Sequence, residues 1–514
     1  MILSIQHPGA FCRKILFLTS ALVLLYLPAR SQKYEFNPVC RQAWDAVMMF
    51  RFNEAGNLLR QEKILNPDNL IPVYIENYID FLILFTGEDL SYFNQHRDLM
   101  KKRIDLLSKG MESSPYYRFC LADLNIQWAF ARLKFREYAT AGLELKRANE
   151  LLKENHARYP AFMPDRLGLG IMNVLAGIIP DNYKWLASMA GLGGNIEQGA
   201  AHIQRIIDYQ GGDPFICSLK SPACIVAALI NVNLRNNPDC AMAVIAKFDT
   251  DPDLRLYAQS PLVIYAKANI YLKTGHNARA LAVLSHRGNE SDYRLSFLDF
   301  QAGTARLNNL DPGAAGSFRK FLAGFRGTNY IKSSWQKIAW ASLLAGDTAS
   351  YRKYIRQALS QGSLEVDEDK QAAGEASSGL MPCVPLLKAR LLFDGGYYQR
   401  ALQTLLNNSL TQYIRNKSDL AEYYYRLGRI YQSLQQSQRA LTNFRLAVKN
   451  GQGLPQYYAA GAALQMGIIH EQQHEYASAD SSYRLCLSMD YKEYKTSLGQ
   501  KARAGLNRVK KHLR

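Results

Sequence analysis

The chain has 514 residues, enough for several ordinary domains or for one extended array of repeats. Hydrophobic residues make up 48% and charged residues 21%, which is typical of a folded protein and excludes a disordered or low-complexity chain. Lysine and arginine exceed aspartate and glutamate by 62 to 44, a formal net charge of +18. Because the excess is spread along the chain, we interpret it as surface charge and expect no nucleic-acid binding.

The first thirty residues have the pattern of an export signal. Arg13 and Lys14 precede an apolar run over residues 15–27, and small residues stand at positions −3 and −1 of a cleavage site after Ser31. The run is shorter than the roughly 20 apolar residues that span a bilayer, so we predict a cleaved signal peptide over residues 1–31, with an uncleaved anchor as the alternative. No later stretch is expected to cross a membrane. The predicted protein is exported, periplasmic or associated with an outer membrane, and peripheral membrane association stays open.

Helical periodicity dominates from Gln42 to the C-terminus, and one residue pattern recurs every 39 residues near the end, marked by Ala401, Ala440 and Ala479. Counted from Ala421 as position 1, each unit has glycine or alanine at position 8, alanine at position 20 and a large apolar residue at position 24. The small residues allow two helices to approach closely, and the large ones fill the space around that contact.

This spacing resembles the tetratricopeptide repeat, a helix–turn–helix unit of about 34 residues, here followed by a short connector. One helix pair cannot bury its own apolar face, so neighbouring pairs stack. We therefore predict an all-α, tetratricopeptide-like solenoid of roughly 9–11 helix pairs. The predicted segments after the signal are N-terminal helical pairs (32–165), a glycine-rich helical module (166–212), a central array (213–359), an acidic flexible connector (360–381) and a C-terminal array with a capping helix (382–514).

The glycine-rich module departs from the repeat. We expect one helix to end at Ile179, a second to begin at Pro180 and a third to begin around Asn195 after a glycine turn. The module resembles the glycine-rich signature of the tetratricopeptide repeat protein 39 and yeast inclusion-body-clearance family, through Gly168, Gly170, Asn173, Pro180, Gly191, Gly194, Asn195 and Gly199. The resemblance covers residues 166–212 and implies an adaptor-like protein. From its residues the module is interpreted as a tight packing unit, with a docking groove as the alternative.

His470, Glu471 and His474 form a literal H-E-x-x-H, the helix motif of zinc hydrolases. That chemistry requires both imidazoles on one face of a continuous helix. In the repeat register, His470 falls at position 11, which packs between helices, and His474 falls at position 15, in the turn. We therefore predict no metal site, no cofactor and no enzymatic activity, and we keep zinc hydrolysis as the least favoured hypothesis.

Seven cysteines remain after the predicted cleavage. A Cys217–Cys224 or Cys224–Cys240 disulfide is one interpretation, because these residues lie close together in sequence. The favoured interpretation is that the cysteines are small buried residues at helix contacts. Residues 501–514 are expected to cap the last repeat, with their charges facing water.

The repeat also predicts where a partner binds. Positions 2, 5, 9, 12 and 13 of each first helix line the concave face of such arrays, and tyrosine and arginine there suit peptide recognition. The predicted partner-binding residues are Tyr265, Asn269, Lys273, Arg390, Tyr425, Arg429, Gln432 and Glu471. The favoured function is an exported, non-enzymatic scaffold or adaptor that binds other proteins or peptides in the cell envelope. The alternative is a helical protein that captures a solute or glycan at an outer membrane.

Overall fold

The computed structural model describes residues 33–179, 185, 188, 191–286, 291–407, 412–491 and 493–513. The predicted signal peptide and its cleavage site lie outside the described residues, and so does the helix start predicted at Pro180. Within the described ranges the chain forms 26 helices and no β-strand, apart from an isolated bridge between Lys33 and Asn69. The predicted all-α class is confirmed.

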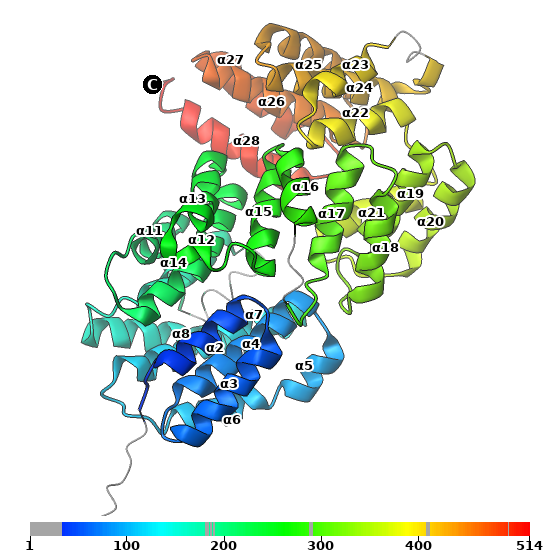
Figure 1. Ribbon diagram of the computed structural model, residues 1–514. Helices are drawn as coiled ribbons and strands as arrows, with labels where there is room; N and C mark the ends of the chain where they lie inside the picture. Colours follow the sequence, from blue (N-terminus) through cyan, green and yellow to red (C-terminus); the bar gives the residue numbers. More distant parts are fainter. Residues whose placement is uncertain are drawn as a thin grey trace, which may run out of the picture.

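The helices follow one another closely along the chain (Figure 1). Their bounds are α2 (Pro38–Met48), α3 (Phe52–Leu65), α4 (Ile71–Gly87), α5 (Leu90–His96), α6 (Leu99–Leu107), α7 (Pro115–Lys134), α8 (Tyr138–Arg158), α9 (Asp165–Ile178), α11 (Ile196–Ile207), α12 (Pro214–Asn233), α13 (Pro238–Thr250), α14 (Pro252–Arg255), α15 (Pro261–Lys273), α16 (Asn277–Ser285), α17 (Phe297–Asn308), α18 (Ala314–Gly324), α19 (Ile331–Leu344), α20 (Thr348–Ser360), α21 (Asp367–Ser378), α22 (Val384–Asp394), α23 (Tyr398–Leu405), α24 (Lys417–Ser433), α25 (Ser437–Gly451), α26 (Tyr458–Gln472), α27 (Tyr476–Ser488) and α28 (Lys495–Val509).

Most of these helices pack as consecutive pairs, and each pair packs on the next. The pairs are α2/α3, α4 with α5 and α6, α7/α8, α9/α11, α12/α13, α15/α16, α17/α18, α19/α20, α22/α23, α24/α25 and α26/α27, and α28 covers the last one. The arrangement is the predicted tetratricopeptide-like solenoid, and its eleven pairs in the described part of the chain agree with the predicted number.

The predicted close contact inside a repeat is present in the last two pairs, α24/α25 and α26/α27. A Cβ atom at Gly428 would lie 2.4 Å from the ring of Phe444, and one at Gly467 would lie 2.5 Å from the ring of Tyr483. Both distances are far below van der Waals contact, so glycine at position 8 is what lets the aromatic ring at position 24 lie against the first helix.

The N-terminal helices contact helices from the middle of the chain. Trp44 Nε1 of α2 donates to the Ser218 carbonyl of α12 at 3.2 Å, and the Ser260 hydroxyl donates to the Met48 carbonyl at 2.5 Å. The backbone N–H of Phe52 also donates to the carboxylate of the distant Asp292 at 2.8 Å. The solenoid therefore curls until its N-terminal pairs lie against pairs from its centre (Figure 1).

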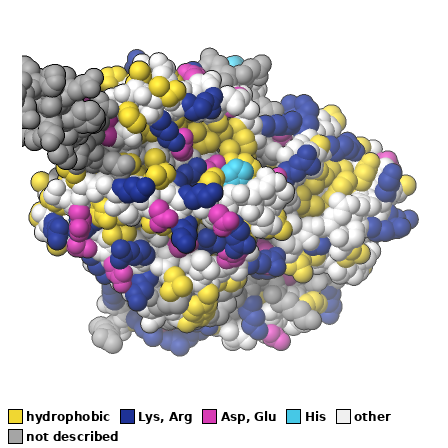
Figure 2. All heavy atoms as spheres, turned by 90° about the horizontal axis from the view of Figure 1, so that it is seen from below, with side chains coloured by type: hydrophobic (Ala, Val, Ile, Leu, Met, Phe, Trp, Pro, Cys, Tyr) yellow, Lys and Arg dark blue, Asp and Glu magenta, His cyan; other side chains and the backbone are white. Residues whose placement is uncertain are grey.

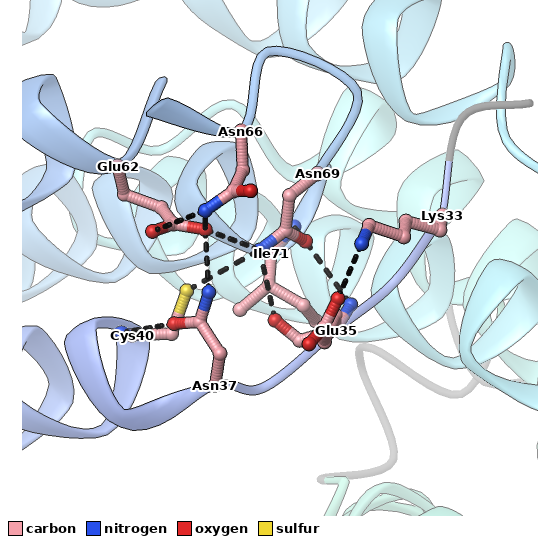
Figure 3. A network of polar contacts seen from close by, with 8 residues as sticks. All are labelled: Lys33, Glu35, Asn37, Cys40, Glu62, Asn66, Asn69 and Ile71. Carbon is pink, nitrogen blue, oxygen red and sulfur yellow. Dashed lines mark hydrogen bonds and ion pairs between the residues drawn. The ribbon is translucent and has the colours of Figure 1, made fainter. Parts of the chain in front are cut away.

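A buried polar network holds the segment that directly follows the predicted cleavage site (Figure 3). The carboxylate of Glu62, which is 1% exposed, accepts hydrogen bonds from Asn37 at 2.6 Å and from Asn69 at 2.9 Å. The side-chain oxygen of Asn69 accepts from the backbone N–H of Glu35 at 3.0 Å. Each buried polar group has a partner, so this N-terminal segment is a packed part of the first helix pair.

In the glycine-rich module, α9 and α11 cross at glycines. A Cβ atom at Gly199 would lie 2.5 Å from the carbonyl oxygen of Gly170 and 2.9 Å from the backbone nitrogen of Val174. Asn195 caps α11 by accepting from the backbone N–H of Gln198 at 2.9 Å, at the predicted place. The module thus has the close approach of backbones that a packing unit requires.

The acidic connector predicted over residues 360–381 needs a correction, because Asp367–Ser378 form helix α21, which packs on α19 and α20. The carboxylate of Asp369 accepts from the backbone N–H groups of Tyr330 at 2.6 Å and Ser333 at 2.8 Å, at the start of α19. Asp369, one of the acids that suggested a solvated linker, serves instead as a hydrogen-bond acceptor for a neighbouring helix.

The expectation that no later stretch could cross a membrane also needs correction. By length and hydropathy α12 qualifies, but 72% of its apolar 18-residue stretch is buried inside the fold. Lys220 within it pairs with Asp253 at 2.7 Å. We interpret α12 as a core helix, apolar on most sides because other helices surround it.

The seven cysteines of the described residues are all free thiols, so neither alternative disulfide is formed. Five of them are buried, and burial raises the pKa of Cys40 and Cys224 to about 12. These thiols therefore stay protonated and act as small apolar side chains, which was the favoured interpretation.

Candidate functional site: a groove on the inner face

Helices α19, α22, α24 and α26 are each the first helix of a pair. Together they form one face of the C-terminal pairs, which we call the inner face. A groove of about 1040 Å³ opens on it. We call it the inner groove, and its lining includes Trp340 (α19), Gln371 and Glu375 (α21), Arg390 (α22), Glu422 (α24), Tyr457 and Tyr458 (start of α26) and Tyr494 (before α28). The docked helix α21 is thus one wall of the groove.

The guanidinium of Arg390 is held in position from two sides. It lies 5.1 Å from the ring centroid of Trp340, a cation–π contact. The side-chain amide of Gln371 is oriented by its hydrogen-bond partners: its oxygen accepts from Arg390 at 3.0 Å, and its nitrogen donates to the Tyr494 hydroxyl at 3.0 Å. The ion pair with Asp394 is long, at 3.8 Å, so much of the hydrogen-bonding capacity of Arg390 stays open.

Two further arginines on α24 stand behind the groove. Arg426 is buried, pairs with Glu422 at 2.9 Å and lies 5.9 Å from the ring centroid of Tyr458. Arg429 donates to the Tyr425 hydroxyl at 3.1 Å. Arginine stays charged in all such settings, so α24 carries two positive charges here, one of which is paired with Glu422.

Tyrosine rings form the other side of the groove. The rings of Tyr457 and Tyr458 lie 4.8 Å apart, and that of Tyr494 meets Tyr457 edge-on at 5.1 Å. Burial raises the pKa of Tyr457 and Tyr458, so both phenols are neutral at physiological pH and can donate hydrogen bonds.

On the α21 wall, the carboxylate of Glu375 is fully engaged. It accepts from Trp340 Nε1 at 2.9 Å, from Gln336 at 2.6 Å and from the Tyr351 hydroxyl at 3.0 Å, and burial raises its pKa. Beside Trp340, burial lowers the pKa of Lys337 to about 8. This wall is pre-organised by internal bonds and needs no partner for its own stability.

Of the predicted partner-binding residues, Arg390 alone is in the groove lining described above. Tyr425 is 4% exposed and stands behind the groove with Arg429. Gln432 is half-buried further along α24, outside that lining. Glu471 pairs with Arg508 of α28 at 2.6 Å, so it holds the capping helix.

The three predicted residues of α15 also lie outside the inner groove. Tyr265 packs edge-on against Phe297, and Lys273 donates to the side-chain oxygen of Asn233 at 2.5 Å. Burial lowers the pKa of Lys273. The side-chain oxygen of Asn269 is buried without a hydrogen-bond partner among the described residues.

The H-E-x-x-H residues do not present one metal-binding face. His470 Nδ1 lies 2.5 Å from the carboxylate of Glu475, whereas His474 has a φ of +61° and stands in the turn after the helix. Gly396 and Gln435, at the same turn position in the two preceding units, have φ values of +79° and +58°. Over the described ranges, no group of three or more metal-ligating side chains could hold an ion.

Sequence reasoning missed most of the groove lining. Gln371, Glu375 and Tyr494 belong to segments that the repeat register does not assign. Tyr457 and Tyr458 precede or begin a first helix, and this aromatic pair is a signal that sequence analysis could have used.

A family model described as tetratricopeptide repeat matches residues 421–450, which cover most of α24 and α25. A search of curated proteins finds no match. The chain therefore contains a tetratricopeptide repeat, a unit that generally mediates protein–protein interactions, and this repeat carries Glu422, Tyr425, Arg426 and Arg429.

Proposed function

We propose that the chain is an exported, non-catalytic scaffold or adaptor that binds a partner protein or peptide of the cell envelope in the inner groove. The observation that carries the proposal is the convergence of positioned arginine and tyrosine side chains from several helices on this groove. The resemblance of residues 166–212 to a family of adaptor-like proteins supports the same class.

The charges around the groove favour a peptide over a polyanion. Its cationic lining residues are matched in number by acidic ones, namely Lys370, Arg390, Arg415, Lys417 and Lys495 against Asp367, Glu375, Asp419, Glu422 and Glu493. A nucleic-acid site would need a surplus of cations along a backbone track. On the face that Figure 2 displays, basic side chains are more widespread than acidic ones. The balance of charges in the groove supports the absence of nucleic-acid binding there.

A photo-crosslinking residue tests the proposal in intact cells. Placed at Tyr494, which is 37% exposed at the groove, it should capture a defined protein. Placed at Leu143, which is 58% exposed on α8, it should not. Arg390→Gln should reduce capture about tenfold, since a lost charged hydrogen bond costs about 1.5–3 kcal/mol. Arg445→Gln, an exposed arginine of α25, is the matched control.

Equal capture at both positions, or capture that is unchanged in the Arg390→Gln variant, would contradict the groove as the binding site. A peptide spanning the crosslinked segment should then bind the purified protein in a fluorescence anisotropy titration, with the same response to the two variants.

The capture of a glycan is a second candidate, because Tyr457, Tyr458 and Tyr494 supply stacking surface around the groove. Oligosaccharides in place of the peptide in the same titration decide between the two. Saturable sugar binding that Tyr458→Ala abolishes, with no captured protein, would favour the glycan function.

Export is tested separately. The N-terminus of the protein purified from its native cells should be Gln32, and Val23→Arg, which places a charge in the apolar run, should leave the chain unprocessed. An intact Met1 in the wild type would indicate the uncleaved alternative, and fractionation with cytosolic proteins would refute export.

A further inference from the structure

A second group of basic side chains lies outside the inner groove, where α8, α9 and α11 pack together. His156 stands near the end of α8, Arg166 at the start of α9, and His202 and Arg205 on α11. We call these four residues the basic cluster. They are contributed by the glycine-rich module and the helix before it, and none lines the inner groove.

Three nitrogen atoms of the basic cluster are buried without a hydrogen-bond partner in the described part of the chain. They are Nδ1 of His156, Nε of Arg166 and Nδ1 of His202. Buried polar groups in folded proteins are almost always paired, so three such atoms in one cluster point to a group that the chain itself does not supply.

The charges that act on the two histidines are positive. Burial, then Arg166, then Arg205 lower the pKa of His156, and the same causes in the same order lower the pKa of His202. Asp165 is the acid whose charge acts on the cluster, at Arg166; its carboxylate accepts from the side-chain amide of Asn155 at 2.9 Å, and burial raises its pKa to about 7.

The other acids on these helices are already engaged. Glu154 of α8 pairs with Arg118 at 2.9 Å, and Glu197 of α11 pairs with Arg235 at 2.7 Å. Asp208, which follows α11, accepts from the side chain of Gln204 at 2.8 Å. The fold therefore gathers four basic side chains, and apart from Asp165 the carboxylates on these helices bond to other residues.

We propose that His156, Arg166, His202 and Arg205 form a binding site for a phosphate group, either free in solution or on the headgroup of an anionic lipid. A phosphate supplies both things that the cluster lacks, negative charge and several acceptor oxygens. The half-buried Arg166 provides the fixed charge and a directional donor, and the exposed Arg205 stands at the entrance from solvent. The imidazoles complete the site as donors.

Binding is linked to protonation of the histidines. In the free protein burial and the two arginines lower the pKa of both imidazoles, whereas a bound phosphate favours the imidazolium forms. By linkage, bound phosphate should therefore raise the pKa of both histidines.

NMR titration of the histidine ring protons in the full mature chain tests the site with inorganic phosphate, against chloride at equal ionic strength. We expect a saturable upward shift of the pKa of His156 and His202 with phosphate alone. Arg166→Gln should weaken phosphate binding about tenfold, the loss expected for one charged hydrogen bond, and Arg445→Gln should not change it. His202→Gln, which removes a different member, should weaken binding as well.

Stability without phosphate separates binding from misfolding. Arg166→Gln removes an unpaired cation, so its melting temperature in phosphate-free buffer should not fall below that of the wild type. The rise in melting temperature that phosphate gives the wild type should be lost in this variant.

Sedimentation with phosphatidylglycerol vesicles and with phosphatidylcholine vesicles distinguishes the two sources. Pelleting with the anionic vesicles that phosphate competes away assigns a lipid headgroup, and no pelleting assigns a free phosphate. An equal response to phosphate and chloride, or an Arg166→Gln variant that binds like the wild type, would overturn the proposal.

Discussion

Replacing Gly199 by alanine should destabilise the crossing of α9 and α11, although alanine is the better helix former. At an exposed helical position the exchange gains about 1 kcal/mol, because alanine loses less backbone entropy on folding. At Gly199 the new Cβ atom would lie 2.5 Å from the Gly170 carbonyl oxygen, about 0.9 Å short of the 3.4 Å at which ordinary contact begins. Both atoms are close to rigid helical backbone, so the helices themselves must separate.

Overpacking of this kind typically costs about 1–3 kcal/mol and here also opens the packing of Ile203 and Val174 around the crossing. We expect a net loss of about 2 kcal/mol in the local stability of the glycine-rich module. Gly316→Ala is the matched control, because Gly316 is an exposed helical glycine with nothing within 4 Å of the new Cβ atom. That change should stabilise its helix by about 0.5–1 kcal/mol.

Hydrogen–deuterium exchange is the suitable assay, since a long solenoid need not unfold in one step and a single melting curve can hide a local change. Amides of α9 and α11 should exchange faster in Gly199→Ala, by about the factor of 30 that 2 kcal/mol represents, while those of α24 and α25 stay unchanged. If Gly199→Ala protects these amides as Gly316→Ala protects those of α18, the crossing is not limited by backbone contact and the reasoning fails.

Three further predictions concern carboxylates. Asp369→Ala should lower the stability of α19 by about 1–2 kcal/mol and release α21, because the carboxylate caps the α19 N-terminus. Hydrogen–deuterium exchange in both helices should become faster, and unchanged rates would refute the capping role. Burial raises the pKa of Asp165 to about 7, so the native state holds its proton more tightly than the unfolded chain and the unfolding free energy should fall as pH rises from about 4 to about 7. Asp165→Asn should remove that fall. Because its amide offers a donor to the unpaired Asn155 Oδ1, the variant should be about 1–3 kcal/mol more stable than the wild type in urea denaturation at pH 8. A variant that is less stable at pH 8 would contradict this. The hydrogen bond from Arg508 lowers the pKa of Glu471, so its stabilisation of α28 is present above the ordinary carboxyl pKa and is lost as pH falls through the lowered value. Glu471→Ala should speed exchange throughout α28 at neutral pH, and unchanged exchange would refute the role of this ion pair in holding the helix. Stoichiometric zinc bound to the purified wild type would revive the hydrolase hypothesis.

Much of the repeat was predictable because its contacts are local. Gly428 touches Phe444 within one helix pair, so the spacing of small and large residues along a short stretch already encodes that packing. The left-handed turn residue His474 follows from the same register, and this is why a literal zinc motif could be set aside before the fold was known.

Helix α21 was not predictable in the same way. Its acids have the composition of a solvated connector, and only the position of α19 turns the carboxylate of Asp369 into a helix cap. Similarly, Glu471 occupies a position that normally faces a ligand, but Arg508 arrives from the last helix and engages it.

The sequence by itself determined the helix pairs, their internal packing and the order of stacking, since helical periodicity and the repeat act over a few tens of residues. Only the tertiary structure decided how the stack curls, which brings Trp44 to Ser218 and places Tyr494 and Gln371 beside Arg390. Curvature is the sum of small rotations from one pair to the next, so contacts between distant repeats depend on every interface between them and leave no local mark in the sequence.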